Sequence, residues 1–350
     1  MRRATGQAAG QAAGQAAAPR RFGRTPDGET VEAVDLAAGG LSATVLTLGA
    51  SLHDLRLDGA DWPLTLGSDD LAAYDGSLRY AGAVVGPVAN RIAGARMMID
   101  GRACALDPNE AGRTTLHGGA SGTHAQVWRI AALGADRVVL VLRLADGLGG
   151  FPGNRTLVAA YRLTAPARLT LCLCAVTDAA TPVNLAFHGY WNLDGQGSIA
   201  GHSLRIAADH YTPVDADKIP TGAVAPVAGT RFDWREPRGL AGAEPIDHNF
   251  CLGAALPGCG LRPAAELRGA SGVWMRVATT APGLQVYDGA HLSLPAPGGL
   301  DGRGYGAGAG LALEPQHWPD APNQPGFPPV LLRPGAVYRQ ATRFDFGLAP

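Results

Sequence analysis

Hydrophobic and polar residues alternate one by one in short runs along most of the chain. An alternation with a period of two places every second side chain on the same face, which is typical of half-buried β-strands. The alternation therefore predicts strands at TVEAVDL (30–36), LSATVLTL (41–48), RVVLVLRL (137–144), RTLVAAYRL (155–163), RLTLCLCAV (168–176), VWMRVATT (273–280) and GLQVY (283–287).

The runs are separated by short stretches rich in Asp, Asn and Gly, such as DGAD (58–61) and IDGR (99–102), which favour tight turns. Helical signals are few and short. The stretch SDDLAAYD (68–75) begins with capping residues, and FDWREPRGLAG (232–242) could hold one or two helical turns. The pattern predicts an all-β fold, a large antiparallel β-sandwich with a few short helices.

The N-terminus differs from the rest of the chain. The motif GQAA occurs three times in tandem and offers no apolar face, so residues 1–21 are expected to form a disordered, low-complexity tail. The repeated glutamines interrupt the apolar run that a signal peptide needs. A cytoplasmic location is then the default expectation. No linker-like segment divides the remainder, so we expect residues 22–350 to form a single domain.

Charge and cysteine content exclude several classes of protein. Lys and Arg total 29 against 30 for Asp and Glu, so the chain has no basic surplus for binding nucleic acid or an anionic membrane. The five cysteines are scattered without a C-x-x-C pair, which indicates neither a disulfide framework nor a zinc ribbon.

Polar residues capable of chemistry gather at a few predicted strand ends. Asn90 and Arg91 interrupt an apolar stretch, where the arginine is either an ion-pair partner or a ligand clamp. His117 precedes two glycines, and His188 lies beside Tyr190 and Trp191. Aromatic faces next to polar donors suit sugar rings, but a core histidine among aromatic residues fits equally well. Asp247, which precedes His248, could equally cap its own turn.

Glu314 is more informative, because it ends the run GLAL and is followed by Pro315, which has no amide hydrogen. A carboxylate half enclosed at a strand end tends to act as a base, and one of the two histidines could supply the acid. We expect no metal site, since His117, His188, Asp247 and Glu314 show no short ligand spacing such as H-E-x-x-H.

These segments together resemble the aldose 1-epimerase (galactose mutarotase) family. The resemblance covers about residues 22–346. It rests on a set of short motifs that occur in the order usual for the family, and none of them would suffice alone. The motifs are NRI (90–92), LHGG (116–119), GFPGN (150–154), NLAFHGYWNL (184–193), FDWREP (232–237), DHNF (247–250), GLQVY (283–287) and LEPQHWPDAPNQPGF (313–327).

The resemblance implies a supersandwich whose concave face holds a monosaccharide and an isomerase that interconverts α and β anomers without a cofactor. It implies that Glu314 is the general base and His188 the general acid. Sugar-binding roles are implied for Asn90, Arg91, His117, Asp247 and Gln285, and Trp191 could stack on the pyranose ring. His317 and Asp320 are expected to support the loop after Glu314. The protein is expected to be a monomer or homodimer with no nucleic acid or membrane partner.

The chain departs from the family's usual motifs at Pro87, where many members have arginine, and at Leu148 or Gly149, where many have an acidic residue. These departures leave the preferred sugar open. Three other functions remain as alternatives: a non-catalytic sugar-binding sandwich, an epimerase acting on a phosphorylated hexose, which would need a further Arg/Lys cluster at the rim, and a glycosidase that uses Asp247 with Glu314.

Overall fold

The computed structural model describes residues 17–254 and 260–349, and each alternating run named above lies on a strand. The predicted start of the folded domain at residue 22 needs a correction. Residues 1–16 of the expected tail lie outside the described residues, but Arg20 and Arg21 already belong to strand β1 and pair with β2. The ordered fold therefore begins before the predicted boundary at residue 22.

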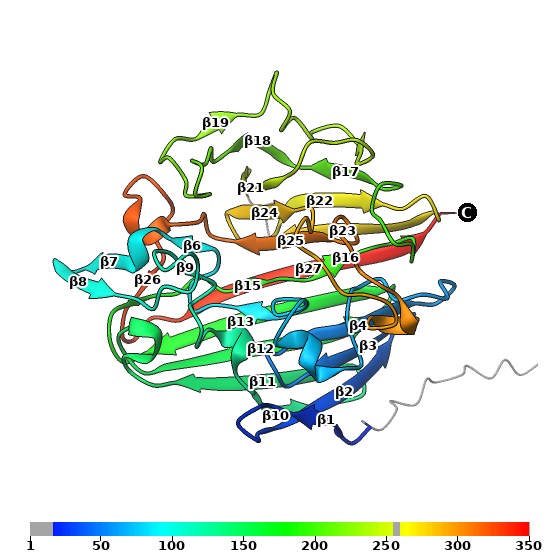
Figure 1. The fold of residues 1–350 in the computed structure, drawn as a ribbon, viewed down its shortest axis with the longest axis horizontal. Coiled ribbons are helices and arrows are strands. Elements are labelled where there is room, and N and C mark those ends of the chain that lie inside the picture. Colours follow the sequence, from blue (N-terminus) through cyan, green and yellow to red (C-terminus); the bar gives the residue numbers. More distant parts are fainter. Residues whose placement is uncertain (1–16, 255–259, 350) are drawn as a thin grey trace, which may run out of the picture.

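The largest sheet contains nine strands and extends from the lower edge of Figure 1 into its upper part. Every neighbouring pair described in it is antiparallel. In spatial order its strands are β10 (Arg129–Leu133), β11 (Arg137–Leu144), β12 (Arg155–Thr164), β13 (Arg168–Thr177), β27 (Tyr338–Leu348), β23 (Val273–Thr279), β22 (Arg262–Arg268), β17 (Ser203–Ile206) and β20 (Arg238–Gly239).

A six-stranded sheet carries much of the chemistry described below. Its order is β16 (Tyr190–Trp191), β25 (Leu311–Gln316), β24 (Gly283–Tyr287), β21 (Asp247–Leu252), β18 (Ala208–Tyr211) and β19 (Ala225–Pro226). A four-stranded sheet follows the chain order through β1 (Arg20–Arg24), β2 (Thr30–Ala38), β3 (Leu41–Leu46) and β4 (Leu52–Leu57).

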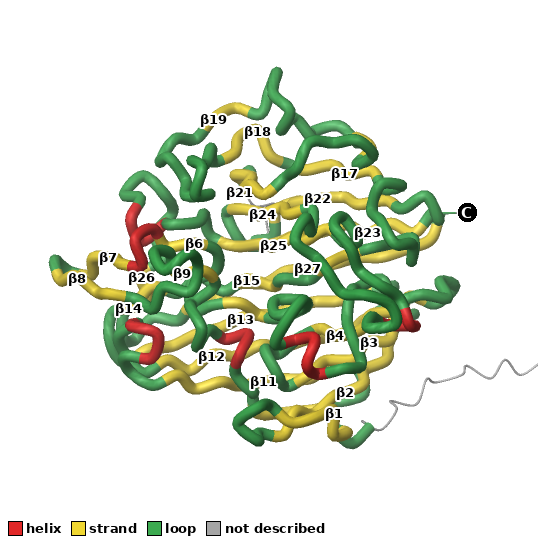
Figure 2. Tube along the Cα trace, in the orientation of Figure 1, coloured by secondary structure: helices red, strands yellow, loops and turns green. Residues whose placement is uncertain are grey.

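The remaining elements are short. Four strand pairs are β14 (Thr181–Pro182) with β26 (Leu331–Leu332), β15 (Ala186–Phe187) with β5 (Val84–Val85), β6 (Arg91–Ile92) with β9 (Thr115–Leu116), and β7 (Arg96–Ile99) with β8 (Arg102–Ala105). The 3-10 helices, red in Figure 2, are η1 (Leu71–Tyr74), η2 (Ala93–Ala95), η3 (Thr123–Ala125), η4 (Leu148–Gly150), η5 (Leu300–Gly302) and η6 (Ala321–Asn323).

The two helical expectations had different outcomes. The stretch 68–75 does contain η1, and the Asp70 side chain accepts a hydrogen bond from Ala72 N–H as its cap. The expectation at 232–242 was wrong, because this stretch forms turns and the short strand β20. Within the described ranges, no helix has the length and apolar character needed to cross a bilayer.

One hydrophobic cluster joins the layers. It draws inward-facing residues from the nine-stranded sheet, such as Leu157 and Phe344, together with Leu311 and Leu313 of β25 in the six-stranded sheet. The two sheets thus bury their apolar faces against each other, as in a β-sandwich. Because side chains alternate along β25, Glu314 points away from this core. The alternation that builds the sandwich therefore delivers the carboxylate to the opposite face.

Candidate active site

A cavity of about 440 Å³ opens on that opposite face. Its size is in the range usual for small-molecule sites. Most of the predicted site residues meet there although the sequence scatters them widely: the lining includes Asn90, Arg91, His117, His188, Asp247 and Glu314.

Glu314 lines the cavity and is only 2% exposed. It pairs across the sheet with Gln285 of β24. Its Oε2 has no hydrogen-bond partner in the described part of the chain. Burial, and then the charge of Asp247, raise the pKa of Glu314 well above its usual value, while the charge of Arg91 opposes this shift. A carboxylate with a raised pKa is a stronger base than an exposed one.

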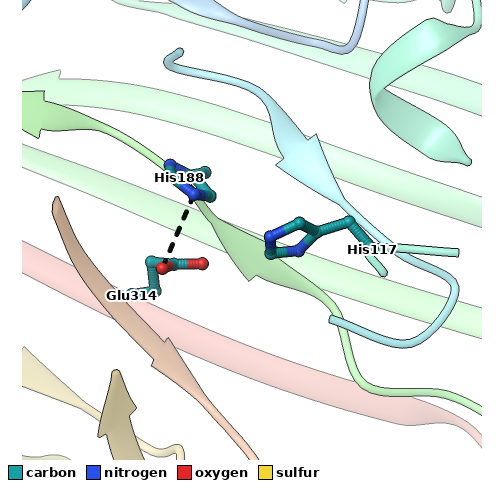
Figure 3. A group of neighbouring side chains, drawn as sticks. All are labelled: His117, His188 and Glu314. Atoms are coloured by element: carbon teal, nitrogen blue, oxygen red, sulfur yellow. Dashed lines mark ion pairs between the residues drawn. The ribbon is translucent and has the colours of Figure 1, made fainter. Parts of the chain in front are cut away.

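His188 lies in the link between β15 and β16, facing Glu314. Its backbone N–H donates to the carbonyl of Ala83 at 2.8 Å, which fixes the link beside β5. The Nε2 atom lies 3.7 Å from Oε1 of Glu314, as Figure 3 shows by its dashed line. Burial lowers the pKa of His188 to about 4.

Burial acts on the two partners in the same direction, toward neutral forms. A neutral carboxyl with a neutral imidazole and a carboxylate with an imidazolium contain the same number of protons. The two forms therefore differ only in the position of one proton. Because 3.7 Å is too long for a hydrogen bond between Nε2 and Oε1, a ligand oxygen between the two groups would have to relay that proton. Such a buried pair, in contact with a cavity, can both give and take a proton from a ligand.

His117 occupies a tight turn after β9. Its N–H donates to the carbonyl of Asn90 at 3.0 Å, and the Asn90 N–H donates back to Nδ1 of His117 at 3.1 Å. The next residue must be glycine: Gly118 has φ +84°, and a Cβ there would lie 2.0 Å from the carbonyl oxygen of Gly86. The glycines of the LHGG motif thus allow close backbone packing, which directs the imidazole of His117 into the cavity.

Arg91 is held by carboxylates on two sides. Its Nε and Nη2 donate to the two carboxylate oxygens of Glu110, both at 2.7 Å, and Nη1 lies 3.9 Å from Asp247. Asp247 also accepts a 2.6 Å hydrogen bond from Nε2 of Gln285. Gln285 itself is absent from the cavity lining. The structure places Gln285 opposite Glu314 on the neighbouring strand, where its hydrogen bond orients the carboxylate of Asp247.

The expected stacking of Trp191 on a sugar is wrong. Trp191 is 0% exposed and packs in the hydrophobic core against Phe187, Phe344 and Phe346. Its neighbour Tyr190 lines the cavity instead, because successive side chains of a strand point to opposite faces.

Replacing this core tryptophan should affect stability rather than catalysis. We expect Trp191→Ala to lower the free energy of unfolding by about 3–5 kcal/mol, through lost burial and the cavity left behind. Urea titration would measure this loss. KM of the folded fraction should stay within a factor of about two of the wild-type value, since Trp191 does not reach the cavity; a KM raised tenfold would restore the stacking role.

Several cavity residues were not predicted. Tyr80 lies with its ring centroid 4.7 Å from those of His117 and His124 and 5.8 Å from that of His188. Tyr80, Arg79 and Lys218 reach the cavity from segments without alternating strands, so strand periodicity gave no signal for them. Glu110 could have been suspected only as a partner for the half-buried Arg91.

The loop after Glu314 is tied to the segment that carries Arg91. Asp320 donates its N–H to the carbonyl of Arg91 at 3.0 Å, and its Oδ1 accepts from Ala93 N–H at 3.0 Å. The N–H of His317 donates to Asn184 Oδ1 at 2.8 Å. These contacts fit the loop-supporting role expected of His317 and Asp320.

The departures at Pro87 and at Leu148 and Gly149 lie outside the cavity lining. A Cβ on Gly118 would lie 2.7 Å from Pro87 Cδ, and one on Gly149 would lie 3.3 Å from the carbonyl of Gly118. Both segments therefore pack near the backbone of the turn that carries His117.

Distances alone would permit a metal ion, because His117, His188 and Glu314 offer donor atoms that all lie within 4.8 Å of one another. The hydrogen bonding of His117 does not fit one. Its Nδ1 already accepts the Asn90 N–H, so the ring hydrogen is on Nε2. Coordination through Nε2 would move that hydrogen to Nδ1, against the amide hydrogen of Asn90. We therefore assign no metal to this cluster.

The chain is similar to known proteins over nearly its whole length. The family model described as aldose 1-epimerase matches residues 32–345. Mouse galactose mutarotase is 40% identical over 341 residues, covering 94% of this chain and 98% of the mouse protein. Aldose 1-epimerase of Escherichia coli K12 is 36% identical, covering 92% and 96%. A crystal structure of an aldose epimerase homologue from C. elegans superposes with a TM-score of 0.85 at 30% identity, covering 91% of this chain and all of that one.

Proposed function

The chain belongs to the aldose 1-epimerase family, and we propose that it interconverts the α and β anomers of a free aldose, with Glu314 as general base and His188 as general acid. The observation that carries this residue assignment is the buried contact between Glu314 and His188, 3.7 Å apart beside the cavity. Family membership makes the chain an isomerase of the epimerase class.

The reaction needs a proton removed and a proton delivered at neighbouring oxygens. Glu314 takes the proton of the C1 hydroxyl while His188 gives one to the ring oxygen, and the bond between C1 and the ring oxygen breaks to leave an open-chain aldehyde. Rotation about C1–C2 exposes the other carbonyl face, and closure with the roles reversed forms the other anomer. A positioned acid or base typically contributes about 10²–10⁴ in rate.

The other polar groups are proposed to hold the sugar. Arg91, Asn90 and Asp247 line the cavity and are fixed by their own hydrogen bonds, which supports a role in positioning hydroxyl groups before reaction. Tyr190 and Tyr80 offer ring surface in place of Trp191. Nothing in the reaction is oxidised or displaced, so we propose no cofactor.

A specific observation keeps a phosphorylated hexose as a second candidate substrate. Arg79 and Lys218 both line the cavity, and neither forms an ion pair within the described ranges. Unpaired cations near a ligand cavity suit an anionic group such as a phosphate. No comparable observation favours the other two alternatives, a non-catalytic sugar-binding sandwich and a glycosidase.

Polarimetry tests the proposed activity directly. Purified protein should speed the approach to anomeric equilibrium of freshly dissolved α-D-galactose or α-D-glucose, with the final rotation unchanged because a catalyst does not shift the equilibrium. The same assay with hexose 6-phosphates, pentoses and deoxy sugars would rank substrates. Spontaneous mutarotation in buffer is the control. A chain that accelerates none of these sugars would contradict the proposal.

A further inference from the structure

The two histidines of the cavity differ in what their ring nitrogens contact. Nδ1 of His188 has no hydrogen-bond partner in the described part of the chain, whereas Nδ1 of His117 accepts the backbone N–H of Asn90. An amide N–H can donate only to a nitrogen that carries no hydrogen. In neutral His117 the single ring hydrogen must therefore be on Nε2.

The backbone holds this arrangement firmly. Asn90 and His117 both adopt left-handed conformations, with φ of 61° and 51°. Their backbones are joined a second time by the bond from His117 N–H to the Asn90 carbonyl. The Asn90 side chain accepts the N–H of Arg91 at 2.8 Å. With these contacts in place, the Asn90 amide hydrogen stays directed at Nδ1 of His117.

The free edge of the His117 ring faces the reacting groups. Figure 3 shows the ring directed toward His188 and Glu314, and its centroid lies 5.2 Å from that of His188. A second imidazolium at this distance would disfavour the protonated His188 that ring opening requires. A neutral N–H donor instead stabilises negative charge without competing for the proton.

We propose that His117 acts as a permanently neutral hydrogen-bond donor through Nε2–H, fixed in that form by the backbone amide of Asn90, and supports the charge that develops on a sugar oxygen. The role rests on the proposed function, but the ring form does not. Burial, followed by the charges of His188, His124 and Arg91, holds the pKa of His117 well below its usual value, which agrees with a neutral ring. The two histidines thus have different roles, since His188 transfers a proton and His117 only donates a hydrogen bond.

The form of the ring can be observed directly by two-bond proton–nitrogen correlation NMR on the full chain labelled with ¹⁵N-histidine. The His117 signals, assigned by their loss in His117→Asn, should show hydrogen on Nε2 and none on Nδ1, without change between about pH 5 and 8. Hydrogen on Nδ1, or protonation of both nitrogens in this range, would overturn the inference. This readout is independent of activity, so a chain that accelerates no anomerisation would overturn only the proposed function.

Two substitutions separate the donor from the structural contact. Asparagine can offer an oxygen near the position of Nδ1 but no donor at Nε2, whereas glutamine can offer a donor near Nε2. We expect His117→Asn to keep the wild-type midpoint of urea unfolding and to lose about 10²–10³ in kcat, the usual effect of removing one such donor. His117→Gln should retain at least about tenfold more kcat than His117→Asn. Equal losses in the two variants would contradict the donor role.

Discussion

Glu314→Gln should lower kcat by a factor of about 10²–10⁴, the usual contribution of a positioned general base. The amide has nearly the shape of the carboxyl group but cannot take the C1 hydroxyl proton. Because burial already favours the uncharged form of Glu314, the substitution should cost little stability. Polarimetric initial rates at saturating sugar would measure kcat, and urea titration would measure stability.

A matched carboxylate away from the cavity provides the control. Glu266 of β22 pairs with Arg268 and Arg276 on the surface of the nine-stranded sheet. Glu266→Gln should leave kcat unchanged, because its contacts do not reach the cavity lining. Full activity in Glu314→Gln would exclude Glu314 as the base.

His188→Asn should produce a loss of similar size, about 10²–10⁴ in kcat, because an amide side chain cannot deliver a proton to the ring oxygen. The backbone bond to Ala83 does not depend on the side chain, so the link between β15 and β16 should stay in place. The rate should be measured together with KM, which is expected to change much less than kcat.

Combining the two substitutions tests whether they act as a pair. If Glu314 and His188 exchange one proton, removing either disables the same step, and the double variant should be little slower than the slower single variant. A double variant whose loss of kcat equals the product of the two single losses would indicate that the residues act in separate steps.

The strands were predictable where most inward positions are apolar. β11, β12 and β13 show a clear alternation because their inward residues are Val, Leu, Ala and Tyr, apart from Arg155 at the start of β12. β27 was missed because Gln340 and Thr342 occupy inward positions. Gln340 donates through Nε2 to the carbonyl of Pro315 at 2.9 Å, next to Glu314. The polar residue that holds the backbone next to Glu314 thus interrupts the apolar alternation by which β27 would have been recognised.

The site was predictable in its polar members and less so in its aromatic ones. The motifs that contain His117, His188 and Glu314 also contain glycines or prolines, which restrict or permit particular backbone conformations. Trp191 was misplaced because β16 has only two residues, too few for alternation to decide which aromatic side chain faces the core. Tyr80 comes from a turn, where no period relates neighbouring side chains.

The pairing of β25 with β24 and β16 must be completed in the correct register before the folding protein becomes active. β16 and β25 are far apart in the chain, and a slip of one residue in β25 would turn Glu314 into the hydrophobic layer. Contacts between distant segments form slowly, since a long loop must close first. Catalytic competence should therefore be among the last properties a newly made chain acquires, and enzyme activity would report native strand registration more faithfully than total β-content does.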